Sequence, residues 1–327
     1  MPVDVLSEVL RAVRLNAAVF FDVNATYPWA LGSPQIARIR DKVMPGAEHV
    51  IPFHFMMSGQ AWLHSGDPAA EPILVEAGDV ILLPRGDAHC MSSDRGFCTA
   101  PDMSYYFRPA DQQLPFRVSD IGGGGAPARI VCGYFGCDAT PFNPLLEALP
   151  RRTIIKSGPD CSKLAWTFIA AALTEGEHAR AGGETILAKL SELMLVQAIR
   201  MYIDCLPDGA EGWLSGLRDP LVSKVLQLIH ADPARDWTLV SLAKQTASSR
   251  SVLAERFTRL VKLPPMQYLA RWRMQLAANA LEQPSASISA IAADVGYQSE
   301  AAFNRAFKKV VGQPPGAWRR NRQDAAA

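Results

Sequence analysis

The sequence has no stretch of about 18 consecutive apolar residues, so it offers no candidate for a transmembrane helix. Its first segment, MPVDVLSEVLRAVRL, contains acidic residues at amphipathic spacing and lacks the basic-then-apolar order of a secretory signal. Charged residues make up only 20% of the 327 residues and hydrophobic residues 49%, which is typical of a globular protein with a large core. We therefore expect a cytoplasmic protein of two or three domains with no membrane partner.

Cysteine is also scarce, and none of the six cysteines belongs to a Cys-x-x-Cys motif. In a cytoplasmic chain, we expect thiols and not a disulfide framework. Cys132 and Cys137, in the segment CGYFGC, could form a bridge if this segment were a hairpin bend. Cys90 follows a histidine that could lower the pKa of its thiol. These three are the redox candidates, and the alternative is that they are small buried hydrophobes.

The net charge of +1 conceals a strong asymmetry along the chain. Residues 216–327 contain 16 Lys and Arg against 8 Asp and Glu, a net charge of +8. Residues 1–215 contain 17 against 24, a net charge of −7. A basic C-terminal third indicates a polyanionic partner such as nucleic acid, although charge alone leaves a chance split open.

The composition of the sequence and the spacing of its apolar residues divide the chain into four parts. Residues 1–155 consist of short apolar runs separated by Gly and Pro, which indicates the strands of a sandwich or barrel. Residues 156–215 are expected to form a helical connector, residues 216–320 to be helical throughout, and residues 321–327 to be a tail.

One apolar stripe in the connector has helical spacing. A helical stripe of this kind either packs on its own domain or forms the seam of a homodimer. Its members are Ile186, Leu190, Leu193, Gln197 and Met201.

Two segments of the basic third, near 238–261 and 287–311, share one layout. Each has a short helix, a turn, a serine, and an amphipathic helix ending in phenylalanine. Gly296 can adopt the positive φ of a sharp turn, and Ser299 can cap the helix that follows. Two such segments joined by a helix around 265–282 predict tandem helix-turn-helix motifs.

The later helix of each motif separates a core face from an exposed face. Leu253, Phe257, Leu260, Phe303 and Phe307 are expected to point inward. The predicted DNA-binding residues on the other face are Arg250, Ser251, Ala254, Glu255, Thr258, Glu300, Ala301, Asn304, Arg305 and Lys308.

Asn304 and Arg305 can form the paired hydrogen bonds that read base edges in a major groove. Better placed for phosphates, which add affinity without sequence choice, are Arg256, Arg259, Lys309 and Arg319. An ordinary solvated face is the alternative, and the tandem occurrence on a basic segment argues against it.

The stretch GDVILLPRGDAHC, residues 78–90, follows the second cupin motif, Gly-x5-Pro-x-Gly-x2-His. Its strand and tight turn would point His89 into a barrel, where His54 and Trp62 would complete a ligand pocket. A zinc site of His54, His89 and Cys90 is the alternative. Adjacent residues of a strand face opposite ways, so His89 and Cys90 could share a metal only at a bulge or turn.

The C-terminal third resembles the DNA-binding domain of AraC/XylS-type transcriptional regulators. The matching segments are SLAKQTASSRSVLAERF (241–257), LPPMQYLARWRMQLAANAL (263–281) and IAADVGYQSEAAFNRAFKKVVGQPPGAWRR (291–320). Three positions depart from the family pattern: Ala247 and Lys262 stand where glycine is usual, and Glu255 where many relatives carry arginine. We therefore expect the first motif to read fewer bases than the second.

The front part is similar to the cupin-type domains found on AraC-type regulators, in segments such as FHFMMSGQAWL (53–63) and EAGDVILLPRGDAH (76–89). The resemblance implies an α+β multidomain protein: an N-terminal cupin β-barrel (jelly roll), a helical connector, and a C-terminal all-α domain with two helix-turn-helix motifs. It further implies an effector-sensing role for the front part and, because the family consists mostly of activators, activation of transcription. We expect a homodimer that binds double-stranded promoter DNA, recruits RNA polymerase and responds to a small-molecule or oxidant effector. A cupin metalloenzyme with an appended helical domain is the alternative.

Overall fold

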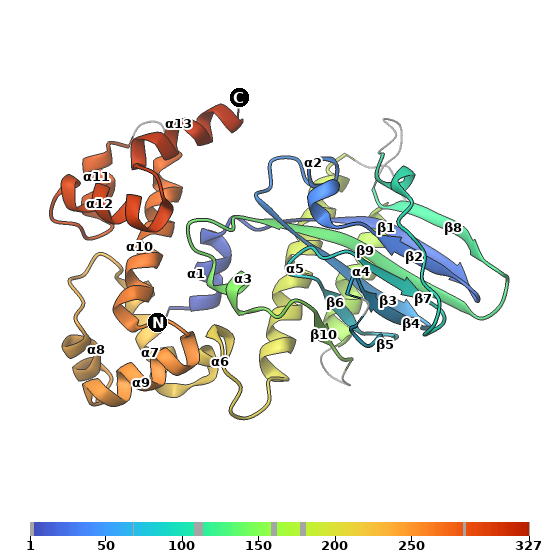
Figure 1. Ribbon diagram of the computed structural model, residues 1–327, viewed down its shortest axis with the longest axis horizontal. Helices are drawn as coiled ribbons and strands as arrows, with labels where there is room; N and C mark the ends of the chain where they lie inside the picture. Colours follow the sequence, from blue (N-terminus) through green and yellow to red (C-terminus); the bar gives the residue numbers. More distant parts are fainter. Residues whose placement is uncertain are drawn as a thin grey trace. The chain divides into compact units, whose positions relative to one another are not determined.

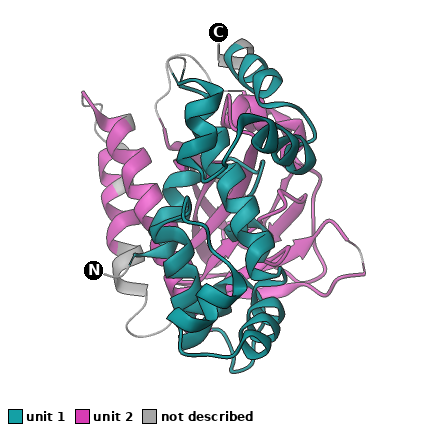
Figure 2. Ribbon diagram, turned by 90° about the vertical axis from the view of Figure 1, so that its left-hand side faces the viewer, with its two compact units in different colours: residues 1–14, 138–148, 206–327 teal, residues 15–137, 149–205 magenta. Residues whose placement is uncertain are grey.

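The computed structural model describes residues 3–67, 69–107, 114–157, 162–176, 181–283 and 286–326 (Figure 1). The chain divides into two compact units, shown in different colours in Figure 2. Unit 1 contains residues 1–14, 138–148 and 206–327, and unit 2 contains residues 15–137 and 149–205. No helix among the described residues is both long and apolar enough to cross a membrane.

Unit 2 is built on two β-sheets. The larger sheet has the strand order β10-β6-β3-β9-β1-β8, and the smaller sheet has the order β2-β7-β4-β5. The predicted N-terminal cupin-type β fold is confirmed. The strands are β1 (Asn16–Thr26), β2 (Ala30–Ser33), β3 (His49–Ser58), β4 (Gln60–Ser65), β5 (Ile73–Glu76), β6 (Val80–Leu82), β7 (His89–Ser92), β8 (Phe116–Gly122), β9 (Pro127–Cys137) and β10 (Thr153–Ile155).

Side chains along these strands alternate between the two faces of each sheet, and those on the inner faces form one core inside unit 2. Met56, Leu63, Val75 and Ile130 are fully buried in it, while residues next to them in the strands face the other way. Two short helical turns and one short helix complete the β part of unit 2. They are η1 (Ile36–Arg38), η2 (Met103–Tyr106) and α2 (Arg40–Val43).

Strand β9 excludes the hairpin bend on which a Cys132–Cys137 bridge would depend. Cys132 and Cys137 lie in one continuous strand of 11 residues. Five residues of extended chain span about 16 Å, far more than a disulfide allows. Each cysteine instead lies opposite a histidine of β3, with Cys132 beside His54 and Cys137 beside His49.

Helices α4 (Ser162–Gly176) and α5 (Gly183–Asp204) pack against each other, and α5 also lies against β1. The predicted apolar stripe on α5 is only partly buried: Met201 is buried, whereas Ile186 and Leu193 are exposed, so its role as a core face or a dimer seam stays a prediction. The helix buries a parallel stripe that includes Leu187, Met194 and Ile199. Both stripes have helical spacing, so spacing alone could not choose between them.

Unit 1 is all-α in its C-terminal part, and the predicted tandem helix-turn-helix motifs are confirmed there. Helices α8 and α9 form the first motif, α11 and α12 the second, and α10 connects them (Figure 1). The helices of unit 1 are α1 (Val5–Ala12), α3 (Pro144–Ala148), α6 (Trp213–Arg218), α7 (Pro220–Ala231), α8 (Leu239–Gln245), α9 (Arg250–Val261), α10 (Pro265–Leu281), α11 (Ile288–Asp294), α12 (Glu300–Val311) and α13 (Pro315–Ala326).

The second helix of each motif begins at a serine and packs through its apolar face. Ser249 Oγ accepts a hydrogen bond from Val252 N, and Ser299 Oγ accepts one from Ala302 N. Every side chain expected to point inward is buried, which confirms the assigned core faces. These side chains are Leu253, Phe257, Leu260, Phe303 and Phe307.

The turns of the two motifs share one backbone conformation but differ in sequence. Gly296 has φ +83° in the second turn, and Ala247 takes the same place in the first with φ +51°. The pattern repeats where α9 and α12 end, at Lys262 with φ +64° and Gly312 with φ +86°. The first motif therefore holds two side chains in the left-handed region, where the second motif has glycine.

Two segments from the front of the chain belong to unit 1. We call residues 3–14 and 138–148 the inserted segments. The Gln275 and Asn279 side chains donate to the Ala12 carbonyl at 3.1 and 2.7 Å. Gln275 Oε1 accepts from the backbone N–H of Phe142 at 3.0 Å, so one buried amide on α10 binds both inserted segments.

Candidate DNA-binding surface and sensor pocket

Helices α9 and α12 present the predicted DNA-binding residues on their outer faces. Eight of the ten side chains are exposed, and Ala254 and Asn304 are half-buried. Oδ1 of Asn304 is buried and has no hydrogen-bond partner among the described residues. A paired amide contact to a base would therefore require another rotamer of Asn304, whereas Arg305 is already exposed.

The candidate phosphate contacts divide into free and engaged side chains. Arg259 and Lys309 are exposed. Arg256 pairs with Asp219, with Nε 2.7 Å from the carboxylate. Arg319 donates to the carbonyl oxygens of Leu281 and Ala286 at 3.0 and 2.6 Å. Two nitrogens of the Arg319 guanidinium thus hold the end of α10 to the start of the second motif, and its phosphate role stays a prediction.

Arg273, on α10, has a comparable structural role on the other side of that motif. Its Nε donates to Pro233 O at 2.7 Å and its Nη2 to Arg235 O at 2.8 Å. Its Nη1 lies 3.4 Å from Gly296 O, in the turn of the second motif. Burial lowers the pKa of this guanidinium, which nevertheless stays charged at neutral pH. One side chain thus fixes the second turn to the loop after α7.

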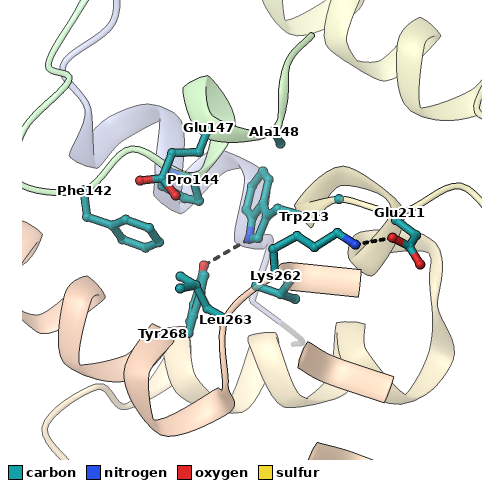
Figure 3. Close-up of a pocket in the computed structure, with 11 residues that line it drawn as sticks. Phe142, Pro144, Glu147, Ala148, Glu211, Trp213, Lys262, Leu263 and Tyr268 are labelled. Carbon is teal, nitrogen blue, oxygen red and sulfur yellow. Dashed lines mark hydrogen bonds and ion pairs between the residues drawn. The ribbon is translucent and has the colours of Figure 1, made fainter. Parts of the chain in front are cut away.

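A cavity of about 220 Å³ opens in unit 1 beside the first motif (Figure 3). Three aromatic residues line it: Phe142 from an inserted segment, Trp213 from α6 and Tyr268 from α10. Trp213 Nε1 donates to the Tyr268 hydroxyl at 3.1 Å, and Lys262 pairs with Glu211 at the rim. The cavity lies where an inserted segment meets the connection between α9 and α10.

The two histidines of the predicted pocket meet inside unit 2. His54 comes from β3 of the larger sheet and His89 from β7 of the smaller one, and their Nε2 atoms are 2.7 Å apart. One nitrogen must donate and the other accept, so neither of these two positions is free for a metal. Nδ1 of His54 contacts Cys132 Sγ at 2.9 Å, and Nδ1 of His89 lies 3.0 Å from Asp87 O.

Both rings are held neutral. Burial lowers the pKa of His89 to about 4, and burial together with the neighbouring His89 lowers the pKa of His54 well below its ordinary value. Burial raises the pKa of the Cys132 thiol, so this thiol is protonated as well. The arrangement is a neutral hydrogen-bonded chain across the interior of the sandwich.

The other two predicted members of the site face outward. Cys90 and Trp62 alternate with core residues of β7 and β4, so they lie on the outer face, and the Arg95 guanidinium stacks 5.5 Å from the Trp62 ring. The predicted pocket role of Trp62 and the zinc site with Cys90 are therefore wrong. No group of three or more His, Cys, Asp or Glu in the described ranges is placed to hold a metal. Burial raises the pKa of Cys90 to about 12, the opposite of the predicted activation.

The histidine pair separates two cavities of very different size. The inner one, beside His54, has a volume of about 20 Å³, room for a single water. Its wall includes Tyr106 and Tyr134. The outer one, beside His89, has a volume of about 510 Å³ and is lined by Arg151 and Arg152. Of these two cavities, the outer one is large enough for a small organic effector and the inner one is not.

Several residues of these sites carry no sequence signal. Gln275 is one amide in a helix, and Arg152 precedes the short strand β10. Cys98 lies eight positions after Cys90, across a loop, and its thiol adds to the burial that raises the pKa of Cys90. The parallel layout of the two motifs could have revealed the conformations of Ala247 and Lys262, because Gly296 and Gly312 occupy the equivalent positions.

A two-sheet unit joined to tandem helix-turn-helix motifs on one connecting helix defines a DNA-binding transcriptional regulator. Residues 4–204 match the cupin family model, and residues 242–321 match the model of a helix-turn-helix domain. A putative AraC-like transcription regulator of Streptomyces lividans is 34% identical over 323 residues, covering 97% of this chain and 98% of the relative. The chain therefore belongs to the AraC-like transcription regulators, which is a family of regulators and not of enzymes.

Two further matches cover nearly the whole chain. The HTH-type transcriptional regulator AlkR of Acinetobacter baylyi is 28% identical, over 97% of this chain and 99% of that protein. The crystal structure of ToxT from Vibrio cholerae O395 aligns over 94% of this chain and 97% of its own, with 11% identity and a TM-score of 0.34.

Proposed function

We propose that this protein is an effector-controlled cytoplasmic regulator that binds promoter DNA through α9 and α12. The observation that carries the proposal is the exposed polar face on the second helix of both motifs, with α10 between them. Helices of this kind enter major grooves, and tandem motifs address successive grooves on one side of the duplex. The excess of basic residues after Gly216 supplies attraction to phosphates.

The second motif is proposed to carry most of the sequence choice. Arg305 and Lys308 are exposed on α12, and Arg305 has the planar fork that pairs with guanine. The corresponding face of α9 carries Glu255, whose negative charge repels phosphates. Its carboxylate oxygens can accept hydrogen bonds only from cytosine or adenine amino groups in the major groove.

Unit 2 is proposed to be the sensor. The outer cavity offers room for a small organic effector above His89. The neutral His54–His89 pair links the two sheets, so a ligand that displaces His89 would change the packing between them. A small molecule or an oxidant is the proposed signal.

We call the C-terminal part of unit 1, residues 206–327, the reader. The connection from the sensor to the reader is proposed to run through β1 and β9. These strands are neighbours, with Asn16 opposite Gly136, and each continues directly into an inserted segment. Both segments are bound by Gln275 of α10, the helix between the two motifs. A shift of this strand pair is therefore proposed to reach α10 through the two inserted segments, at the hydrogen bonds of Gln275 to Ala12 and Phe142.

The protein is further proposed to act as a homodimer that recruits RNA polymerase and activates transcription. The exposed apolar residues Ile186 and Leu193 on α5 support a self-association surface in the 156–215 connector. Activation follows the prevailing behaviour of the family that the sequence resembles.

A binding experiment tests the proposal. Selection from random duplex DNA should return a preferred site, and affinity for that site should fall steeply as salt concentration rises. Arg305→Ala should weaken specific binding about 5- to 150-fold, the range of a lost paired base contact. Glu255→Ala, on the matching helix of the first motif, should change the affinity far less. Equal losses for the two variants, or no preferred site, would contradict the proposal.

A further inference from the structure

Two thiols meet on the outer face of the smaller sheet. Cys90 lies in β7 opposite Gly32 of β2 and His64 of β4. Its neighbour Met91 belongs to the buried core, and His89 faces the interior, so Cys90 points outward. There burial, together with the neighbouring thiol of Cys98, raises the pKa of Cys90, so the two thiols lie on the same outer face.

The backbone holds Cys98 at this place. The residues that follow it return over β2, where Gly32 forms a bridge with Pro101. A Cβ on Gly32 would lie only 2.4 Å from Thr99 O, so the close approach depends on this glycine. The bridge and the close approach thus place the segment after Cys98 against the strand partner of Cys90, independently of the pKa of Cys90.

The two sulfurs differ in access. Cys98 is exposed, whereas Cys90 is only 3% exposed. An oxidant in solution therefore reaches Cys98 first, and Cys90 is the thiol beside it that can resolve the oxidised form.

We propose that Cys90 and Cys98 form a reversible disulfide in response to a two-electron oxidant of the peroxide class. Hydrogen peroxide transfers a hydroxyl group to the Cys98 sulfur, breaking its O–O bond, and one water leaves. The Cys90 sulfur then displaces that hydroxyl group, which departs as a second water with the Cys90 proton. The sulfurs lose two electrons to peroxide, and a dithiol reductant restores both thiols by exchange.

The bond would act on the sensor through β7. A disulfide brings the sulfurs to about 2.0 Å, closer than two thiols without a covalent bond. His89 is the neighbour of Cys90 in that strand, and its ring bonds His54 in the interior. A small shift of β7 on the outside therefore reaches the histidine pair inside. This regulatory consequence, unlike the bond itself, rests on the proposed function.

Peptide mapping of the full chain tests the bond directly. Trypsin separates the two cysteines into peptides 86–95 and 96–117, because Arg95 lies between them and Pro109 protects Arg108. After hydrogen peroxide and thiol blocking, the two peptides should appear as one linked species that dithiothreitol separates. Cys98→Ser should abolish it, and Cys205→Ser, which removes another exposed thiol, should not. Oxidation of Cys98 without linkage to Cys90, or linkage to a different cysteine, would overturn the inference.

DNA binding measured on the same samples separates the two proposals. Oxidation should change the affinity of the wild-type protein for its selected site about fivefold or more, and leave Cys98→Ser unchanged. A linked species without a change in affinity would overturn the regulatory role. Failure to link in a protein that binds DNA normally would overturn the bond and leave the proposed function intact. Linkage in a protein that binds no preferred DNA site would overturn the proposed function alone.

Discussion

Replacing Gly296 with alanine should destabilise the second helix-turn-helix motif strongly. An L-residue at φ +83° costs about 1–2 kcal/mol, because its Cβ crowds its own carbonyl oxygen. The added Cβ would also lie 2.3 Å from Ala234 O, in a loop that Arg273 fixes in place. Forcing that contact apart costs about 1–3 kcal/mol more. We therefore expect Gly296→Ala to lower the free energy of unfolding by about 2–5 kcal/mol.

The first motif supplies the matched control at the equivalent position. Ala247→Gly removes the cost of an L-residue at φ +51°, while the glycine adds about 0.5–1 kcal/mol of chain entropy to the unfolded state. The net change should be a stabilisation of roughly 0.5 kcal/mol. Urea unfolding followed by tryptophan fluorescence measures both variants, because Trp272 and Trp318 are buried in unit 1. An unchanged midpoint for Gly296→Ala, or a clear loss of stability for Ala247→Gly, would refute this reasoning.

Three further expectations concern unfolding and salt. The free energy of unfolding should fall by about 3 kcal/mol as pH drops from 6.5 to 4, because burial lowers the pKa of His89 to about 4 and the unfolded chain binds the proton first; urea titrations should show a flatter profile for His89→Gln. Gln275→Leu should cost about 1–3 kcal/mol and speed hydrogen exchange at Phe142, whose N–H loses its acceptor; unchanged exchange would contradict this. Arg319→Ala should lower the melting temperature but leave the salt dependence of DNA binding unaltered. Lys309→Ala should instead reduce, by about one, the slope of log binding constant against log salt concentration. The reverse pattern would assign a phosphate role to Arg319.

The reader part of the molecule was largely predictable because its signals are local. Helical spacing assigned Leu253, Phe257 and Phe303 to the core, and serine caps marked where α9 and α12 begin. These features depend on residues within one turn of each other. The exposed faces of both helices followed directly, and their contacts with DNA remain predictions.

Strand orientation was harder to predict. The cupin motif correctly placed His89 inside, yet Trp62, which was assigned to the pocket, lies on the outer face, as does Cys90 of the alternative zinc site. A shift of one residue reverses every side chain of a strand, and the sequence does not show where a strand is regular. The same uncertainty left a bend at CGYFGC open, and the segment is the end of β9.

Hydrogen bonds between side chains and residues far apart in the chain could not be predicted from the sequence. Gln275 binds Ala12 and Phe142, which are 263 and 133 positions away. Arg14 forms paired hydrogen bonds to Asp138 at 2.6 and 2.9 Å, and the two residues are 124 positions apart. The side chains of these residues are ordinary surface types, and only the fold makes them partners.

The inserted segments have a consequence for exchanging parts between members of the family. A chimera that joins a foreign sensor to this reader at Leu206 would discard residues 3–14 and 138–148. The buried amide of Gln275 would then lose its contacts to both segments, and the Tyr268 ring would lose Phe142, whose ring centroid lies 5.5 Å away. A working exchange must carry those two segments with the reader, or take α10 with the sensor. Residue 206 is therefore not a boundary at which the two parts can be exchanged without breaking buried contacts of α10.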